Sequence, residues 1–285
     1  MSNHILSGKD YLSLPRAPET WLIDPLIPAG GACLVYGDPK IGKSYAALQL
    51  ALALQNGTEW LGFHVPRKAR TVYVQLDTPR SLWAERLESL ARGGVQGIDQ
   101  LPQADLGTLG TWPFDILEDD HLELLKFSLK QWAPDLVVID TLRECHSGDE
   151  NDSTMMKNVM SRLIAATQPA ALMLIHHSKK PVPDQQMDLM NDMRGGYIAG
   201  KMDAIIKFTN RGVHYIGRSI EQGLVPAERA SNGFWSGLGG DTDHWLPVVL
   251  GDESLDTLEK KADALATLTS RPIVQCRGVV RRAQR

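Results

Sequence analysis

An eight-residue glycine-rich stretch constrains this chain more than any other feature. Residues 37–44 read Gly-Asp-Pro-Lys-Ile-Gly-Lys-Ser and match the phosphate-loop pattern G-x-x-x-x-G-K-[ST] in full. The apolar residues 32–36 predict a buried strand before it, and the Ala- and Leu-rich residues 45–55 predict a helix after it. Because strand, loop and helix follow in this order, we expect a phosphate site here rather than a glycine turn with a solvated lysine.

Each part of the loop has an expected role in holding a nucleoside triphosphate. The glycines let the backbone turn tightly and aim its N–H groups at phosphate oxygens. Lys43 is expected to reach the β- and γ-phosphates, and the Ser44 hydroxyl to hold Mg²⁺. The predicted nucleotide-binding set is Gly37, Asp38, Pro39, Lys40, Ile41, Gly42, Lys43, Ser44 and Tyr45.

A second motif lies about a hundred residues downstream. Residues 135–140 read Asp-Leu-Val-Val-Ile-Asp, an apolar run ending in an acid, which is typical of a central parallel strand. Ligands of open α/β sheets bind at the carboxyl ends of the strands, so Asp140 is predicted to lie beside the phosphate loop and to orient Mg²⁺. The two motifs together predict ATP and Mg²⁺ as cofactors.

Composition excludes several other classes. The chain has 285 residues, is 43% hydrophobic and 22% charged, and has no apolar run long enough to span a membrane. Its three cysteines, Cys33, Cys145 and Cys276, lack metal-ligand spacing, and residues 1–18 have no signal-peptide core. We therefore expect a cytoplasmic protein without a membrane partner. The net charge of −4 argues against a globally basic nucleic-acid binder, but not against a local basic channel.

Alternating patterns predict an α/β fold with a mostly parallel central sheet flanked by helices, ending in a β-hairpin. The expected organisation is a lead-in over 1–20, an ATPase domain over 21–225 and a C-terminal extension over 226–285. The elements expected after the phosphate-loop helix are a strand over 71–77, a helix over 81–92, a short strand near 106, a helix over 119–132, the strand ending at 140, a helix over 154–167, a strand over 170–175, and a hairpin over 204–208 and 213–217.

Two segments have no core pattern. Residues 179–193 predict a loop that leaves the catalytic edge of the sheet. The C-terminal tail has no acid after residue 270 and is either a disordered basic tail or a contact for a phosphate backbone. Its arginines are Arg271, Arg277, Arg281, Arg282 and Arg285.

The chain resembles the RecA-like ATPases of the plasmid and phage RepA type, which are hexameric replicative helicases. The resemblance covers residues 21–220, about 70% of the chain. It rests on the Trp-Leu-Ile-Asp lead-in, the Pro-Ala-Gly-Gly turn, the phosphate loop, Trp-Leu-Gly over 60–62, Asp-Thr-Leu-Arg over 140–143, Glu-Asn-Asp over 150–152, Leu-Ile-His-His-Ser-Lys over 174–179 and Arg-Gly-Gly over 194–196. It implies one strand between the phosphate-loop strand and the Asp140 strand, ATP sites at subunit interfaces, and a central channel for single-stranded DNA.

The resemblance also implies roles for two further residues. Where the family has a glutamate as general base at the end of the second strand, this chain has Asp77. Aspartate is one methylene shorter, which argues against fast hydrolysis but not against ATP binding. His176 or His177 corresponds to the γ-phosphate sensor, and because successive strand residues point to opposite faces, at most one can contact the nucleotide. We favour His177 over its neighbour; ordinary polar residues at a strand end are the alternative.

An arginine finger is expected to reach the γ-phosphate of the neighbouring subunit. Arg218 is the preferred candidate, and Arg211 and Lys207 are the others. Lys179, Lys180 and Arg194 flank the 179–193 loop and would form a basic ring in a hexamer, giving salt-sensitive DNA binding. That loop lacks aromatic residues, so base stacking is not expected.

These observations lead to one principal hypothesis and one alternative. The principal hypothesis is a ring-forming, DNA-stimulated ATPase with helicase activity in replication of a plasmid, phage or mobile element, with partner proteins from the same system. The alternative is a slow regulatory or loader-type ATPase that binds a protein partner. A small-molecule kinase would need an arginine-rich acceptor lid, which the sequence does not show.

Overall fold

The computed structural model describes residues 7–13, 21–93, 95, 97–101, 103–104, 114–179, 187–193, 197–231, 233–237, 249–251, 254–269 and 273–283. The helices are α1 (Gly8–Ser13), α2 (Lys43–Asn56), α3 (Arg80–Arg92), α4 (Asp119–Trp132), α5 (Ser153–Thr167), α7 (Leu258–Thr269) and α8 (Ile273–Ala283). The strands are β1 (Trp21–Ile23), β2 (Ile27–Pro28), β3 (Ala32–Gly37), β4 (Thr71–Gln75), β5 (Gln103–Ala104), β6 (Leu136–Asp140), β7 (Ala171–His177), β8 (Ala204–Thr209), β9 (Gly212–Gly217), β10 (Gly223–Val225), β11 (Ala227–Arg229) and β12 (Trp235–Gly237).

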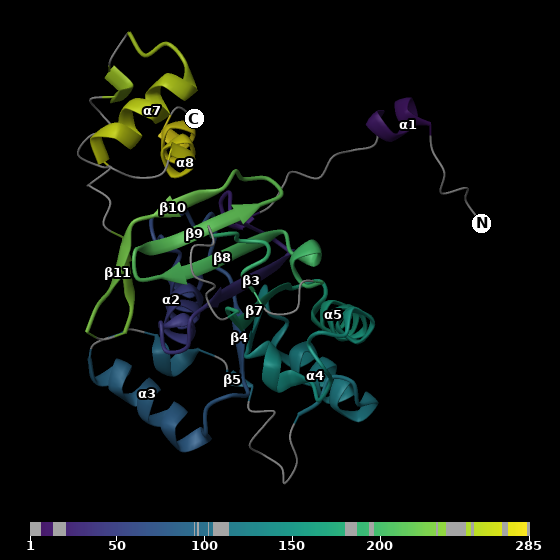
Figure 1. Ribbon diagram of the computed structural model, residues 1–285. Coiled ribbons are helices and arrows are strands. Elements are labelled where there is room, and N and C mark those ends of the chain that lie inside the picture. Colours follow the sequence, from purple (N-terminus) through teal and green to yellow (C-terminus); the bar gives the residue numbers. More distant parts are fainter. Residues whose placement is uncertain are drawn as a thin grey trace.

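One eight-stranded sheet organises the chain, with strand order β10-β9-β8-β3-β7-β6-β4-β5 (Figure 1). The strands from β8 to β5 in this order pair in parallel, and β9 and β10 extend the sheet antiparallel at one edge. β7 lies between the phosphate-loop strand β3 and the Asp140 strand β6, which confirms the strand order that the resemblance implied. The predicted fold class, a RecA-like core with a mostly parallel sheet, is therefore confirmed.

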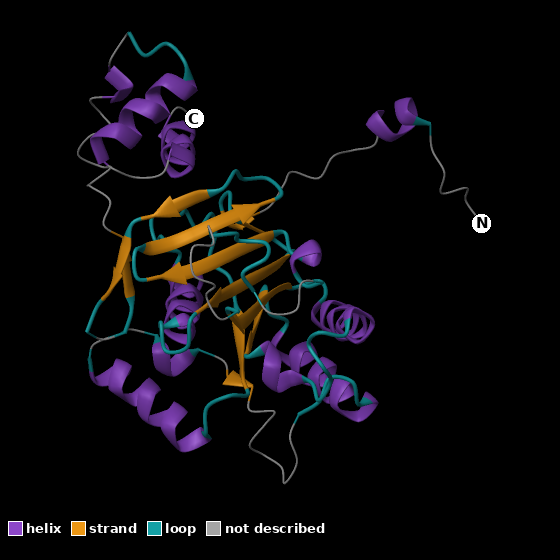
Figure 2. Cartoon of the chain, viewed as in Figure 1, coloured by secondary structure: helices purple, strands orange, loops and turns teal. Residues whose placement is uncertain are grey.

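Both faces of the sheet are covered by helices, which explains why its central strands are continuously apolar (Figure 2). On one face, Cys33 and Val35 of β3 belong to a core with the buried side of α2 and with Trp83 of α3. On the other face, Leu34 and Tyr36 of β3 belong to a core with residues of α4 and α5. The alternation along β3 thus fixes each face against its own helical layer.

The observed elements follow the predicted ones closely. The helix over 119–132 has the predicted bounds, and the hairpin is β8–β9 around the turn at 210–211. The strand predicted near 106 lies outside the described residues, and β5 occurs just before it at Gln103–Ala104. β1, β2 and the turn between them contribute four side chains to the core: Leu22, Ile23, Leu26 and Ile27.

The residues after β10 form a second hairpin, β11–β12, and the helix pair α7–α8 (Figure 1). The helix pair has a small core of its own, and Gln275 Nε2 of α8 donates a hydrogen bond to the Leu61 carbonyl at 3.0 Å. The expectation of a disordered tail is wrong for residues 273–283, because they form α8, in which Arg277 pairs with Glu259 of α7. Arg271 and Arg285 lie outside the described residues. Among the described helices there is no span with the length and apolarity that crossing a bilayer requires.

Candidate nucleotide site

The carboxyl ends of β3, β4, β6 and β7 meet at one edge of the sheet, where they border a cavity of about 430 Å³. This edge is where open α/β sheets bind ligands. The cavity is lined by Lys40, Gly42, Lys43, Ser44, Tyr45, Asp77, Thr78, Arg86, Asp140, Thr141, Ile175, His177 and Arg229. The structure therefore brings together five of the nine predicted nucleotide-binding residues, both predicted acids and the favoured histidine. Gly37, Asp38, Pro39 and Ile41 belong to the same loop but do not line the cavity.

The phosphate loop has a backbone that its glycines permit. Gly42 has φ 106° at the N-cap of α2, in the left-handed region that favours glycine. Gly37 lies so close to β8 that a Cβ atom would meet the Phe208 carbonyl oxygen at 2.6 Å. Lys40 adopts φ 64°, which is uncommon for a residue with a side chain. The loop thus opens directly into the N-terminus of a fourteen-residue helix, whose free N–H groups favour an anion.

Lys43 is held inside the loop by its backbone. Its Nζ donates hydrogen bonds to the Gly37 carbonyl at 3.0 Å and the Asp38 carbonyl at 2.9 Å. Burial lowers the pKa of this ammonium to about 8, against the opposing influence of Asp140, Asp38 and Asp77. A phosphate group that enters the cavity would add negative charge beside this ammonium and offset the cost of its burial.

Nucleotide affinity is therefore expected to depend on pH through Lys43. A bound phosphate favours the charged ammonium, so the pKa of Lys43 is higher in the complex than the value of about 8 in the free protein. Below pH 8, Lys43 is protonated in both the free protein and the complex, so the affinity does not change with pH. Above pH 8, Lys43 of the free protein loses its proton and must regain it on binding, so the affinity falls by up to about tenfold for each unit that the pH rises. Titrating a fluorescent ATP analogue between pH 7 and 9.5 measures this. A flat profile would contradict this prediction, because binding would then take up no proton at Lys43 in this range.

Asp140 and Ser44 form an oxygen-rich corner of the cavity. Asp140 is buried at the end of β6, and burial raises its pKa, while hydrogen bonds from Tyr73 and Ser44 oppose the shift. The Tyr73 hydroxyl donates to Asp140 Oδ2 at 2.7 Å. Mg²⁺ prefers oxygen ligands and commonly takes one carboxylate together with phosphate oxygens and waters. Asp140 and Ser44 therefore fit the Mg²⁺ that the phosphate loop implies, and would hold it against the phosphates.

Asp77 follows β4 and lies at the same edge as Asp140. The backbone N–H groups of Leu76 and Asp77 donate to the Asp140 carbonyl at 2.7 and 3.3 Å, which ties the end of β4 to the end of β6. Asp77 lines the cavity and interacts electrostatically with Lys43. Asp77 therefore borders the cavity together with Lys43, and its role as general base remains a prediction.

The two histidines of β7 separate as the strand alternation predicts. His177 lines the cavity and pairs with Gly37 in the register between β7 and β3. His176 is fully buried, with its Nε2 atom 3.9 Å from Glu150 Oε1. His177 is therefore the histidine that can contact a nucleotide, although its sensor role is a prediction.

The three finger candidates have different environments. Arg218 follows β9 and lies near Asp203 at 3.3 Å, at the opposite edge of the sheet from the phosphate loop, so it cannot act on this chain's own nucleotide. Arg211 lies in the β8–β9 turn at the same edge as the loop. Lys207 Nζ forms an ion pair with Asp192 Oδ2 at 2.7 Å, so its charge has a partner within the same chain.

Sequence reasoning missed two arginines of the cavity, Arg86 and Arg229. Arg86 of α3 lies over the Tyr45 ring at 5.0 Å and over the Trp83 ring at 5.1 Å. Arg229 of β11 lies over the Tyr45 ring at 5.3 Å. Helical phase could have placed Arg86 on the same side of α3 as Trp83. No signal in the sequence places Arg229, because β11 reaches the loop only through the fold.

A glycine loop between a parallel strand and a helix, with a buried acid two strands away, defines a P-loop nucleotide-binding protein. The comparison with protein families agrees, since residues 6–182 match the family described as "AAA domain". This match covers more than half of the chain, so the chain belongs to that family of ATPases. Arg229 and the rest of the sheet after β7 lie beyond the matched residues.

Proposed function

We propose that this ATPase is a ring-forming motor of the RepA helicase type that acts on single-stranded DNA. The observation that carries the proposal is the direct connection between the nucleotide cavity and a lysine-bearing loop. His177 lines the cavity, and Lys179 follows two residues later at the start of that loop. A change at the γ-phosphate would therefore have a path of two residues to the loop that we propose binds DNA.

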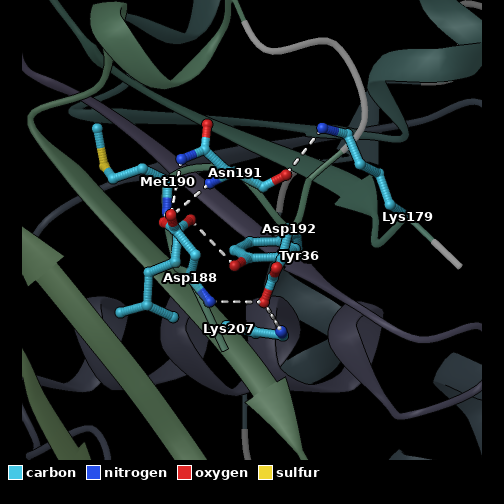
Figure 3. A network of polar contacts seen from close by, with 8 residues as sticks. Tyr36, Lys179, Asp188, Met190, Asn191, Asp192 and Lys207 are labelled. Carbon is cyan, nitrogen blue, oxygen red and sulfur yellow. Dashed lines mark hydrogen bonds and ion pairs between the residues drawn. The ribbon is translucent and has the colours of Figure 1, made fainter. Parts of the chain in front are cut away.

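The far limb of this loop, residues 187–193, is bound to the sheet through Tyr36 of β3 and Lys207 of β8 (Figure 3). The Tyr36 hydroxyl donates to the Leu189 carbonyl at 3.0 Å, and Tyr36 is the residue before Gly37. The limb thus contacts the strand that leads into the phosphate loop. Lys179 Nζ donates to the Asn191 carbonyl at 2.8 Å, so the two ends of the loop also bind each other.

Asp192 is the anchor of this limb (Figure 3). Its Oδ2 atom accepts from Lys207 Nζ at 2.7 Å and from the backbone N–H of Asp188 at 3.0 Å. Its backbone carbonyl accepts from the Lys179 N–H at 2.7 Å. Asp192 thus joins β8 to the far limb through its side chain, and it joins the far limb to the near end of the loop through its backbone carbonyl.

Asp192→Asn is expected to remove most of the DNA stimulation of hydrolysis while basal hydrolysis stays within about twofold. The charge that pairs with Lys207 is lost, so the loop is held less firmly to β8. Steady-state ATP hydrolysis with and without oligo(dT) measures the ratio. Glu123→Gln, which breaks the exposed Glu123–Lys126 pair on α4, is the matched control. Undiminished stimulation in Asp192→Asn would show that the loop is not the coupling element.

The DNA partner is tested by binding of a fluorescent oligo(dT) in the presence of a non-hydrolysable ATP analogue, at several salt concentrations. The proposal predicts ATP-dependent binding that weakens as salt rises, and a ring-sized species in sedimentation velocity. Unwinding of a forked duplex then tests the helicase step. Binding that is absent at low salt would contradict the motor.

One observation favours the alternative, a slow ATPase switch controlled by a protein partner. Asp77 stands at the end of β4, where the RepA-type enzymes have a longer glutamate. A carboxylate displaced by about 1 Å can cost about 10²-fold in rate. Asp77→Glu separates the two functions. A motor limited by this distance is expected to gain hydrolysis that DNA stimulates, whereas a switch is expected to gain hydrolysis that DNA does not change.

A further inference from the structure

The β11–β12 hairpin lies against the helix that follows the phosphate loop (Figure 1). Gln49 of α2 binds Trp235 of β12 through both of its amide atoms. Its Nε2 donates to the Trp235 carbonyl at 2.7 Å, and its Oε1 accepts from the Trp235 N–H at 3.0 Å. The Trp235 ring packs on Phe208 of β8 at 5.0 Å between ring centroids. The hairpin is therefore fixed to the nucleotide site by paired hydrogen bonds and aromatic packing.

This attachment places Arg229 of β11 over the loop. Its Nη1 donates to the Lys40 carbonyl at 3.0 Å and its Nε donates to the Gly233 carbonyl at 3.3 Å. A guanidinium has five N–H donors, so three remain beyond these two bonds. Arg229 also lines the cavity beside Lys43 and Ser44. Arg229 thus adds a cation from a distant segment of the chain to those already at the cavity, Lys40, Lys43 and Arg86.

Trp235 adds an independent sign that something binds at this point. Its indole Nε1 is buried and has no acceptor among the described residues. The same atom lies 3.2 Å from where a Cβ atom on Gly42 would stand, and Arg229 Nε lies 3.0 Å from that point. Buried N–H donors are nearly always satisfied, so this donor, held against the loop, is expected to gain an acceptor when the loop engages a ligand.

We propose that Arg229 is a nucleotide-binding residue, supplied in cis by the β11–β12 hairpin, which contacts the phosphate chain and fixes the loop through Lys40. The ligand class is a nucleoside di- or triphosphate, whose phosphates match the planar guanidinium and its donors. The inference rests on nucleotide binding at the phosphate loop and not on the helicase role. It extends the site past the residues that match the AAA domain family, which end at 182.

Equilibrium binding of a fluorescent ribose-labelled ADP to the full chain tests this, because ADP requires no hydrolysis. Arg229→Ala is expected to weaken binding by about tenfold or more, and Arg229→Lys by less, since it keeps the charge but loses the fork. Arg229→Gln, of similar length without the charge, is expected to reduce the salt dependence of the dissociation constant, which loss of packing alone would not do. Arg92→Ala, an exposed arginine at the end of α3, is the matched control.

The outcomes separate this inference from the proposed function. If the wild type binds ADP, Lys43→Ala does not, and Arg229→Ala and Arg229→Gln bind as Arg92→Ala does, then Arg229 is not a ligand and the inference is overturned. If the wild type itself binds no nucleotide, the proposed function fails first. Gln49→Ala provides a second test, because it removes both hydrogen bonds that join the hairpin to α2 and leaves Arg229 intact. It is expected to weaken ADP binding in the same direction, and unchanged binding would overturn the role of the hairpin.

Discussion

Lys43→Ala is expected to lower ATP hydrolysis by more than about 100-fold and to weaken ATP binding strongly. The side chain stands buried between the Gly37 and Asp38 carbonyls, at the mouth of a helix N-terminus. Its charge would hold the phosphates, and it would also stabilise the charge that builds up during transfer. Removing one such preorganised group typically costs about 10²–10³ in rate. Steady-state phosphate release at saturating ATP measures the loss.

The matched control for this variant is Lys130→Ala, because Lys130 is an exposed lysine on α4, away from the cavity. Its activity is expected to equal that of the wild type. The thermal unfolding temperature of Lys43→Ala without nucleotide should stay close to the wild-type value or rise slightly, since the substitution removes a buried charge. Substantial hydrolysis by a folded Lys43→Ala protein would show that the phosphate loop is not the catalytic site.

Asp140→Asn is expected to lower hydrolysis by about 10²–10³-fold while the protein remains folded. The substitution keeps the shape of the side chain and an oxygen that can accept from Tyr73. It removes the negative charge that would hold Mg²⁺ against the phosphates beside Ser44. Hydrolysis measured as a function of Mg²⁺ concentration checks this, because the variant should need far more of the ion than the wild type.

A binding experiment distinguishes a metal role from a structural one. In the presence of EDTA, the wild type and Asp140→Asn should bind ATP with similar affinity, whereas with Mg²⁺ only the wild type should improve. Asp263→Asn, an exposed acid on α7, serves as the control. If Asp140→Asn still gains affinity from Mg²⁺ as the wild type does, Asp140 does not hold the ion.

The core of the fold follows from the sequence because its signals are local and agree with one another. The apolar run of β6 is buried throughout, and the alternation of strand and helix leads to a parallel sheet. The helix over 119–132 has acids in its first turn and a lysine in its last, and these charges favour the ends where they occur. The sequence alone does not show that β10 continues the sheet, because a three-residue edge strand has almost no periodicity.

The phosphate-binding half of the site was predictable, and the half formed by distant segments was not. The carboxyl ends of parallel strands must meet at one edge of the sheet, and the predicted residues lie at or just after these ends. All five line the cavity: Lys43, Ser44, Asp77, Asp140 and His177. Arg229 lies near Lys40 only because Gln49 and Phe208 hold its hairpin there. Contacts between segments separated by more than 180 positions leave no pattern in a single sequence.

The same reason applies to the loop that we propose binds DNA. Residues 179–193 have no core periodicity, so the sequence predicts only that they form a loop. The structure shows that residues 187–193 are held by Tyr36 and Lys207, two side chains of the central sheet. Lys207, one of the candidates for the finger, thus also holds this limb through its ion pair with Asp192.

The most direct test of the motor function is ATP hydrolysis by the purified chain, measured with and without single-stranded DNA, beside Lys43→Ala. We expect Mg²⁺-dependent hydrolysis that DNA raises several-fold and that Lys43→Ala abolishes with and without DNA. Slow hydrolysis that is indifferent to DNA would contradict the motor and favour the switch that a protein partner controls.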